Sequence, residues 1–107
     1  MTEHLVVTTT VNEEEAARRI ANALVETRLA ACVQVIGPIH SVYRWEDEVQ
    51  AGEEWLCLIK TSEECYEDLE RSLKELHPYD VPQVIALPIV AGSGDYLNWL
   101  ADQLRSS

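Results

Sequence analysis

Apolar residues follow a strand-like pattern in some segments of this chain and a helical spacing in others, which predicts a mixed α and β structure. Leu5–Val11 is an uninterrupted run rich in β-branched residues, which predicts a buried strand. Ala16, Ile20 and Leu24 then recur at helical spacing, which predicts a helix over residues 13–27. The first two elements are therefore expected to be a strand followed by a helix.

The middle of the chain has an extended pattern. Cys32–Ile36 predicts a strand, and the pair Gly37-Pro38 interrupts it as a bulge or bend would. Apolar and polar residues alternate again to Trp45, the polar stretch 47–52 predicts a turn, and residues 53–61 return as a second strand. Both arms reach about twice the usual strand length of ~5–6 residues.

A second helix is predicted before Pro78, which stops it, from four apolar residues on one face: Tyr66, Leu69, Leu73 and Leu76. Pro82–Val90 reads as another strand. A short final helix follows, carrying Leu97, Leu100 and Leu104.

Three polar residues are predicted to begin the helices. Asn12 is the expected N-cap of the first, and Thr61 with Glu64 has the spacing of a capping box before the second. Ser93 is the expected N-cap of the last helix.

The order β-α-β-β-α-β, followed by a C-terminal helix, is that of the ferredoxin-like split βαβ fold. This α+β architecture has one four-stranded antiparallel sheet with two helices on one face. The 107 residues fit a single domain spanning 1–107.

The long hairpin predicts self-association. Two helices of this length cannot cover arms that extend well past them, so the side chains of Trp45 and Trp55 would be exposed to solvent on a monomer. We expect a homo-oligomer in which the arms, with Tyr43, Trp45 and Trp55, meet neighbouring subunits. The alternative is a hairpin folded back on its own sheet.

Charge and cysteine content narrow the functional classes. The net charge is −11, from 8 basic and 19 acidic residues, which argues against nucleic acid and against an anionic membrane surface as partners. The three cysteines form no CxxC pair, and Cys32 and Cys57 lie in apolar runs that predict buried thiols. A reducing cytoplasm suits this pattern. No serine lies in a nucleophile-elbow sequence, so no enzymatic activity is predicted.

The corner at residues 76–82 carries the main candidate chemistry. His77 stands beside Tyr79 and Asp80 where a helix must end and a strand must begin. An imidazole there can serve as a metal ligand, a general acid-base or a pH switch. It can equally be a hydrogen-bonding residue at the helix end, because the three histidines of the chain are too scattered to specify a metal site.

Several sequence blocks together resemble the CutA divalent-cation-tolerance family, in order and over nearly the whole chain. The blocks span residues 28–33, 41–46, 58–61, 77–88 and 95–100. The resemblance implies a ferredoxin-like protomer in a tight homotrimer with interlocking hairpins, an architecture similar to the PII signalling proteins, and clefts between subunits. It also implies a link to tolerance of copper and other divalent cations, without enzymatic activity.

The resemblance further implies a ligand set for copper: a cysteine in the first strand and two adjacent histidines at the helix end. Here Thr9 and Leu76-His77 occupy these positions, so only His77 matches. A threonine hydroxyl is a poor ligand for soft copper. No cofactor is required, with Cu²⁺ or Zn²⁺ as an optional ligand at His77.

The leading hypothesis is a cytoplasmic homotrimer of the cation-tolerance type that binds divalent metal weakly. Trp45, Lys60 and Tyr79 are the candidate residues of the inter-subunit cleft, near His77. One alternative is a PII-like sensor with an anionic ligand in that cleft, held by Lys60 and Arg44. Another is a structural or adaptor trimer.

Overall fold

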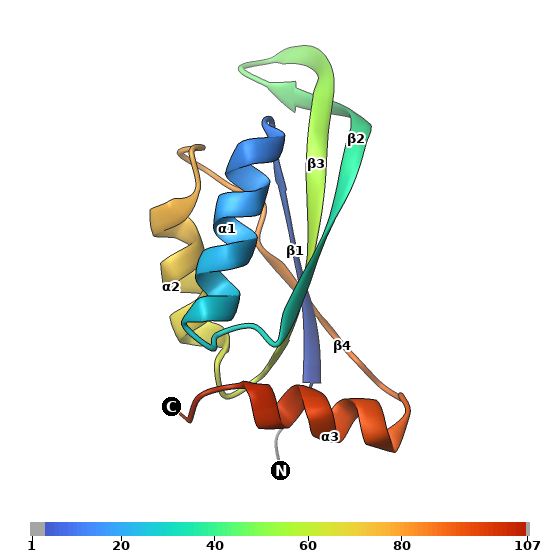
Figure 1. Cartoon of the computed structure of the whole chain (residues 1–107). Coiled ribbons are helices and arrows are strands. Elements are labelled where there is room, and N and C mark those ends of the chain that lie inside the picture. Colours follow the sequence, from blue (N-terminus) through green and yellow to red (C-terminus); the bar gives the residue numbers. More distant parts are fainter. Residues whose placement is uncertain (1–3, 107) are drawn as a thin grey trace.

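The computed structural model describes residues 4–106 and has the predicted split βαβ arrangement (Figure 1). The elements in chain order are β1 (His4–Val11), α1 (Glu14–Glu26), β2 (Cys32–Trp45), β3 (Glu48–Ser62), α2 (Tyr66–Leu76), β4 (Ile85–Pro88) and α3 (Gly94–Gln103). The strands form one sheet in the order β2-β3-β1-β4, and all neighbours are antiparallel. The sequence prediction of fold class is thereby confirmed.

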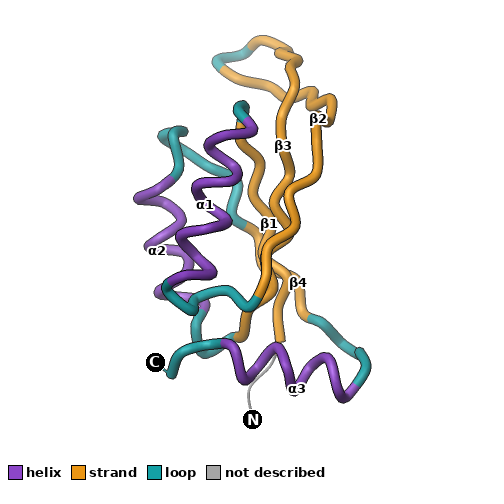
Figure 2. The backbone as a smooth tube through the Cα atoms, in the orientation of Figure 1, coloured by secondary structure: helices purple, strands orange, loops and turns teal. Residues whose placement is uncertain are grey.

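The core lies between the sheet and the two helices α1 and α2, which cover one face (Figures 1 and 2). Alternate residues of β1 point into it, and Val7 and Val11 are fully buried. Ile20 of α1 and Leu73 of α2 meet them from the helical layer. Strict alternation in β1 therefore sends one set of side chains to the core and the other to the opposite face. Helix α3 crosses the end of the sheet instead (Figure 1).

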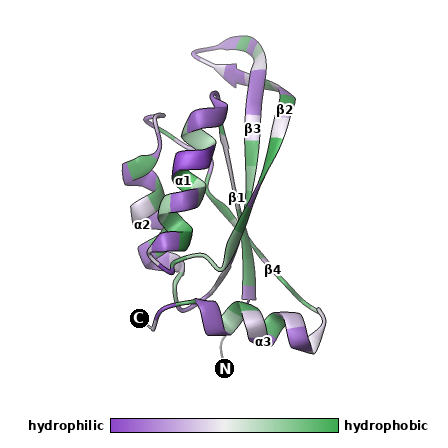
Figure 3. Ribbon diagram, in the orientation of Figure 1, coloured by the Kyte–Doolittle hydropathy of each residue, from purple (hydrophilic) through white to green (hydrophobic). Residues whose placement is uncertain are grey.

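The face of the sheet opposite α1 and α2 is rich in apolar side chains. Val6 pairs across β1 and β4 with Leu87, and Leu56 pairs with Ile36 across β3 and β2. Ile36 and Leu87 are 45% and 52% exposed. Apolar residues thus follow the strands on both sides, in agreement with the hydrophobic strand segments in Figure 3. An exposed apolar sheet face of this kind is typical of an interaction surface.

The β2–β3 hairpin projects past the N-terminal end of α1 and curves at its tip (Figure 1). Its arms have 14 and 15 residues, so the prediction of unusually long strands is confirmed. The turn predicted over residues 47–52 is wrong, because the chain reverses at Glu46 and Asp47 alone. Both have positive φ, 51° and 64°, which is the backbone of a two-residue hairpin turn.

A β-bulge in β2 separates two registers of the hairpin. Ile36 lies opposite Leu56, but Ile39 lies opposite Glu54, so β2 carries one extra residue at Gly37-Pro38, whose peptide bond is cis. A Cβ atom on Gly37 would collide with the ring of Trp55. The predicted interruption at Gly37-Pro38 is therefore confirmed as a bulge.

The helix starts differ from two of the three capping predictions. α1 has Glu13 rather than Asn12 at its N-cap, with no side-chain hydrogen bond. Thr61 does not begin a capping box, because β3 continues to Ser62 and the Thr61 hydroxyl donates to the carbonyl of Leu29 at 2.7 Å. Ser93 does cap α3, since its Oγ accepts from the amide of Tyr96.

Two further boundaries and one burial prediction need correction. β4 covers only Ile85–Pro88 rather than residues 82–90, because pairing with β1 is confined to these four residues. Cys57 is fully buried as predicted, but Cys32 is only half-buried and its Sγ lies 3.4 Å from the Tyr96 hydroxyl. All three cysteines are free.

Candidate functional site

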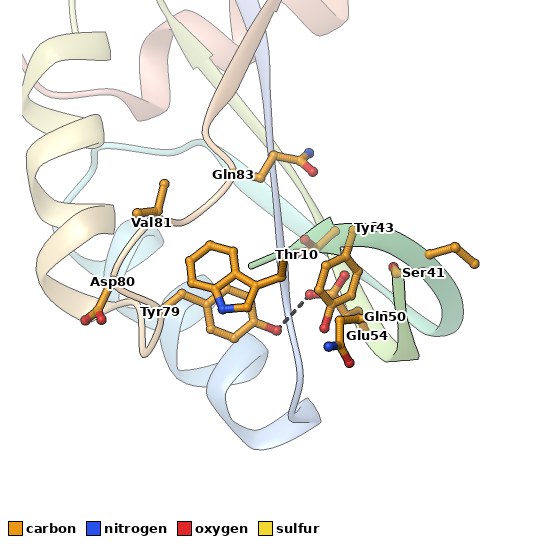
Figure 4. Close-up of a pocket in the computed structure, with 11 residues that line it drawn as sticks. Thr10, Ser41, Tyr43, Gln50, Glu54, Tyr79, Asp80, Val81 and Gln83 are labelled. Atoms are coloured by element: carbon orange, nitrogen blue, oxygen red, sulfur yellow. Dashed lines mark hydrogen bonds between the residues drawn. The ribbon is translucent and has the colours of Figure 1, made fainter. Parts of the chain in front are cut away.

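A pocket of about 770 Å³ lies between the distal hairpin and the corner that joins α2 to β4. The hairpin supplies one wall and the corner supplies the other (Figure 4). Its lining residues are Thr10, Ser41, Val42, Tyr43, Trp45, Gln50, Glu54, Tyr79, Asp80, Val81 and Gln83. Trp45 and Tyr79 both line this pocket, which lies within one chain, whereas the sequence analysis placed them at a cleft between subunits; that inter-subunit cleft stays a prediction.

Aromatic rings and one carboxylate form the centre of the pocket. Figure 4 shows Tyr43, Glu54 and Tyr79 converging there, and the Tyr79 hydroxyl donates to Glu54 Oε2 at 2.7 Å. Burial, followed by this hydrogen bond and the Glu54 charge, raises the pKa of Tyr79 far above its usual value. Tyr79 therefore stays protonated and holds Glu54 in place. Trp45 is half exposed, and its indole N–H donates to Glu46 at 3.0 Å.

His77 lies directly behind the pocket as the C-cap of α2. Its Nε2 lies 2.9 Å from the carbonyl of Thr10, and its Nδ1 accepts the amide of Tyr79 at 3.1 Å. This pair of contacts requires the neutral tautomer with the proton on Nε2. Burial lowers the pKa of His77, which a backbone hydrogen bond to Thr10 and the charge of Glu54 partly oppose. The ring also packs edge-on against Tyr79 with centroids 4.7 Å apart.

The residues at the implied copper positions do not fit a copper ion. Both ring nitrogens of His77 already have hydrogen-bond partners, and the side chain is 7% exposed. Thr9 points into the helix-covered core, where its hydroxyl is buried and has no hydrogen-bond partner among residues 4–106. Within residues 4–106, no three His, Cys, Asp or Glu side chains are grouped so that they could hold a metal. His77 as a metal ligand stays a prediction that this geometry disfavours.

Lys60 does not reach the pocket. It lies opposite Cys32 in the sheet, and its ammonium donates to the Gln34 side chain on the face away from the helices. Arg44 does not line the pocket either, and its guanidinium donates to the carbonyl of Asp47 at the hairpin turn. The pocket lining found within residues 4–106 contains two carboxylates and no basic side chain, which does not favour the predicted anionic ligand.

Trp55 also differs from expectation. Together with Trp45 it was predicted to be solvent-exposed on a monomer, near the hairpin tip, but it is half-buried and packs against the core beneath α1. It lies opposite Val11, on the helix-covered face of the sheet. Tyr43 and Trp45, in contrast, are 49% and 51% exposed, as a surface awaiting a partner would be.

Glu54 is the pocket residue that sequence reasoning missed. The strand predicted over residues 53–61 already contained Glu54, but no role was assigned to its side chain. The signal was present in the alternation of Glu54, Leu56 and Leu58, which places all three on one face of a strand. Gln50 and Gln83 had no distinguishing pattern and could be found only from the fold.

The sheet order and the two-helix layer define a ferredoxin-like α+β protein, and the long bulged hairpin and its pocket distinguish it within that class. The model of the CutA1 divalent ion tolerance protein family matches residues 5–103. The chain belongs to this family.

Individual relatives agree with that assignment. The divalent-cation tolerance protein CutA of Thermus thermophilus is 50% identical over 97 residues, which cover 91% of this chain and 94% of the relative. A chloroplastic CutA protein of Arabidopsis thaliana is 46% identical over 102 residues, and the match covers 95% of this chain but 56% of that protein. The crystal structure of CutA1 from Oryza sativa superposes with a TM-score of 0.95 at 45% identity, covering 98% of this chain and 96% of that one.

The relatives differ in the compartment that their names give. A structure of CutA from Archaeoglobus fulgidus, described as periplasmic, has a TM-score of 0.92 and 33% identity, covering 95% of this chain and 99% of that chain. The Arabidopsis relative is chloroplastic. Family membership therefore does not fix a compartment. In the part of the chain that the structure describes, no helix is both long and apolar enough to cross a membrane.

Proposed function

We propose that this protein serves in divalent-cation tolerance as a homotrimer assembled through the uncovered face of its sheet. The observation that carries the assembly is the row of apolar side chains on that face, with Ile36, Ile85 and Leu87 each 45–52% exposed. The curved hairpin, which bears the half-exposed Tyr43 and Trp45, extends the same surface beyond the protomer. In a ring with closed cyclic symmetry, every subunit buries the same surface against its neighbours.

Light scattering tests the assembly directly. The wild-type particle should have three times the 12.1 kDa chain mass. Leu87→Lys puts a charge on the proposed contact face and should lower the particle mass. Val25→Lys is the matched control, because Val25 is 40% exposed on the surface of α1. A monomeric wild-type protein, or equal dissociation of both variants, would contradict the proposal.

The role in cation tolerance does not require a tight metal site at His77, and we propose that Cu²⁺ and Zn²⁺ bind weakly. Calorimetric titration of wild type, His77→Gln and His40→Gln with each ion tests this. Glutamine at position 77 can still donate to the Thr10 carbonyl that His77 Nε2 contacts, and His40 is exposed. Binding should be weak and equal in all three proteins. Tight binding lost only in His77→Gln would establish His77 as a ligand.

We also propose that the protein acts without catalysis and in a reducing cytoplasm. His77 is held by two backbone groups, and the Tyr79 hydroxyl is committed to Glu54, so neither has the free position that an acid-base catalyst uses. Cys57 and Cys65 are buried free thiols, which a reducing compartment preserves. Fluorescence imaging of the tagged chain in its native cell tests the compartment.

A further inference from the structure

We propose that Tyr79 positions the distal hairpin, residues 39–54, for assembly. Its hydrogen bond to Glu54 holds this segment at one angle to the rest of the protomer, so that the segment meets a neighbouring subunit already oriented. The consequence for assembly rests on the proposed trimer, whereas the hydrogen bond itself lies within one protomer. It requires no side chain of the distal hairpin to be accessible to solvent or to a ligand.

The distal hairpin lacks the sheet neighbours that hold the rest of β2 and β3. The pairing of β1 with β3 ends at Val11, which lies opposite Trp55, and the register of β2 changes at the bulge between Ile36 and Ile39. Beyond these points, within residues 4–106, the two strands pair only with each other. A two-stranded hairpin is marginally stable at best in water, so this segment needs a further contact to keep one orientation.

Tyr79 supplies that contact from the opposite wall of the pocket. Its hydroxyl donates to Glu54 Oε2 at 2.7 Å (Figure 4), and a hydrogen bond to a carboxylate is among the stronger ones in proteins. Glu54 lies opposite Ile39, the first residue of β2 that pairs after the bulge. The bond therefore restrains both strands at the point where the distal hairpin begins. Burial raises the pKa of Tyr79, so the phenol keeps the proton that it donates.

Tyr79 is itself anchored to the body of the protomer. Its amide donates to His77 Nδ1 at 3.1 Å, and His77 Nε2 donates to the carbonyl of Thr10, in β1, at 2.9 Å. The rings of His77 and Tyr79 also pack edge-on, with centroids 4.7 Å apart. A chain of hydrogen bonds thus runs from β1 through the α2–β4 corner to Glu54 in β3. Because this chain begins at a central strand, Tyr79 can hold the distal hairpin against a fixed support.

An oriented distal hairpin makes assembly more favourable. Tyr43 and Trp45 lie on it, and the proposed trimer places them against neighbouring subunits. A hairpin without its restraint would populate several orientations, and only the fraction in the competent one could bind, which weakens the apparent affinity by that fraction. Each closed trimer orders three such hairpins, so the penalty applies once for every subunit.

Two pairs of variants test the assignment by light scattering on dilution, with the same urea concentration in every sample, chosen so that wild type dissociates within the measured range. Tyr79→Phe removes the hydroxyl and keeps the ring, and should dissociate at a protein concentration at least about tenfold higher than wild type. Tyr66→Phe is the matched control and should follow wild type, because the half-buried Tyr66 donates to Glu70 at 2.8 Å within α2. Glu54→Gln keeps an acceptor for Tyr79 and should assemble better than Glu54→Leu, which has none.

Equal dissociation of Tyr79→Phe and Tyr66→Phe, or equal losses in the two Glu54 variants, would overturn the proposal. A monomeric wild-type protein would instead refute the proposed trimer, and hydrogen exchange followed by mass spectrometry would then test Tyr79 on its own. The amides of residues 39–53 should exchange at least about tenfold faster in Tyr79→Phe than in wild type and Tyr66→Phe. Equal exchange in all three monomers would show that Tyr79 does not hold the distal hairpin.

Discussion

Two buried threonines of the core should respond in opposite directions to the same substitution. Thr9 and Thr61 are both fully buried. The Thr61 hydroxyl donates to the carbonyl of Leu29 at 2.7 Å, whereas Thr9 Oγ1 has no hydrogen-bond partner among the described residues. Valine has nearly the same shape as threonine and suits a strand equally well. Thr→Val therefore isolates the hydroxyl group at each site.

The magnitudes follow from hydrogen-bond accounting. Thr9→Val removes a hydroxyl that is buried without compensation, a cost of about 1–3 kcal/mol, so the variant should be more stable by roughly 1 kcal/mol or more. Thr61→Val leaves the carbonyl of Leu29, a residue only 3% exposed, without this donor. We expect a loss of about 1–2 kcal/mol there.

Thermal unfolding followed by circular dichroism measures both changes. About 1 kcal/mol corresponds to a shift of ~4–8 °C for a domain of up to 100 residues. All proteins must be compared at one concentration, because assembly makes the melting temperature depend on concentration. A Thr9→Val protein that melts as far below wild type as Thr61→Val would refute the reasoning, since it would show that the Thr9 hydroxyl makes a stabilising contact.

Gly37→Ala should lower the free energy of unfolding by about 1–3 kcal/mol, measured by urea titration, since the added methyl group would collide with Trp55. Gly52→Ala is the control, because its Cβ position has open space and the variant should show no loss from such a clash. Because the folded protein lowers the pKa of His77, the unfolded chain takes up a proton at this residue more readily than the folded chain does. The stability that His77 contributes is therefore complete above its ordinary pKa of 6.5 and is lost as the pH falls below that value. Urea unfolding at pH 7.5 and 5 should therefore show a smaller acid loss for His77→Gln than for wild type. His40→Gln should follow wild type, and parallel losses in all three proteins would remove His77 as the cause.

Much of the fold could be predicted because its signals are local. The apolar alternation of β1 and the helical spacing of Ile20 and Leu24 report directly on which face is buried. Pro78 and the pair Gly37-Pro38 mark interruptions through the geometry of proline itself. The family resemblance rested on other local blocks, such as residues 77–88, and is confirmed by the match over residues 5–103.

The errors arose where tertiary contacts override local preference. Thr61 has the spacing of a cap, but β3 extends through it and the hydroxyl bonds to Leu29 instead. Glu46 and Asp47 turn the hairpin without a glycine, so the usual turn signal was absent. The pocket could not be composed from sequence, because Glu54 and Tyr79 are 25 residues apart and meet only in the folded chain.

The extra residue in β2 acts as a phase shift between the two halves of the hairpin. Before it, the even-numbered residues of β2, such as Ile36, lie opposite the even-numbered residues of β3; after it, Tyr43 and Trp45 do. Without that extra residue the ladder would run on regularly, with Ile39 still opposite Glu54, so Tyr43 and Trp45 would keep the face that they share with Glu54. The bulge therefore decides how the distal half of the hairpin bends and twists, and not which of its side chains face the pocket. An insertion or deletion there would change the angle between the two walls of the pocket while leaving every pocket residue in the sequence.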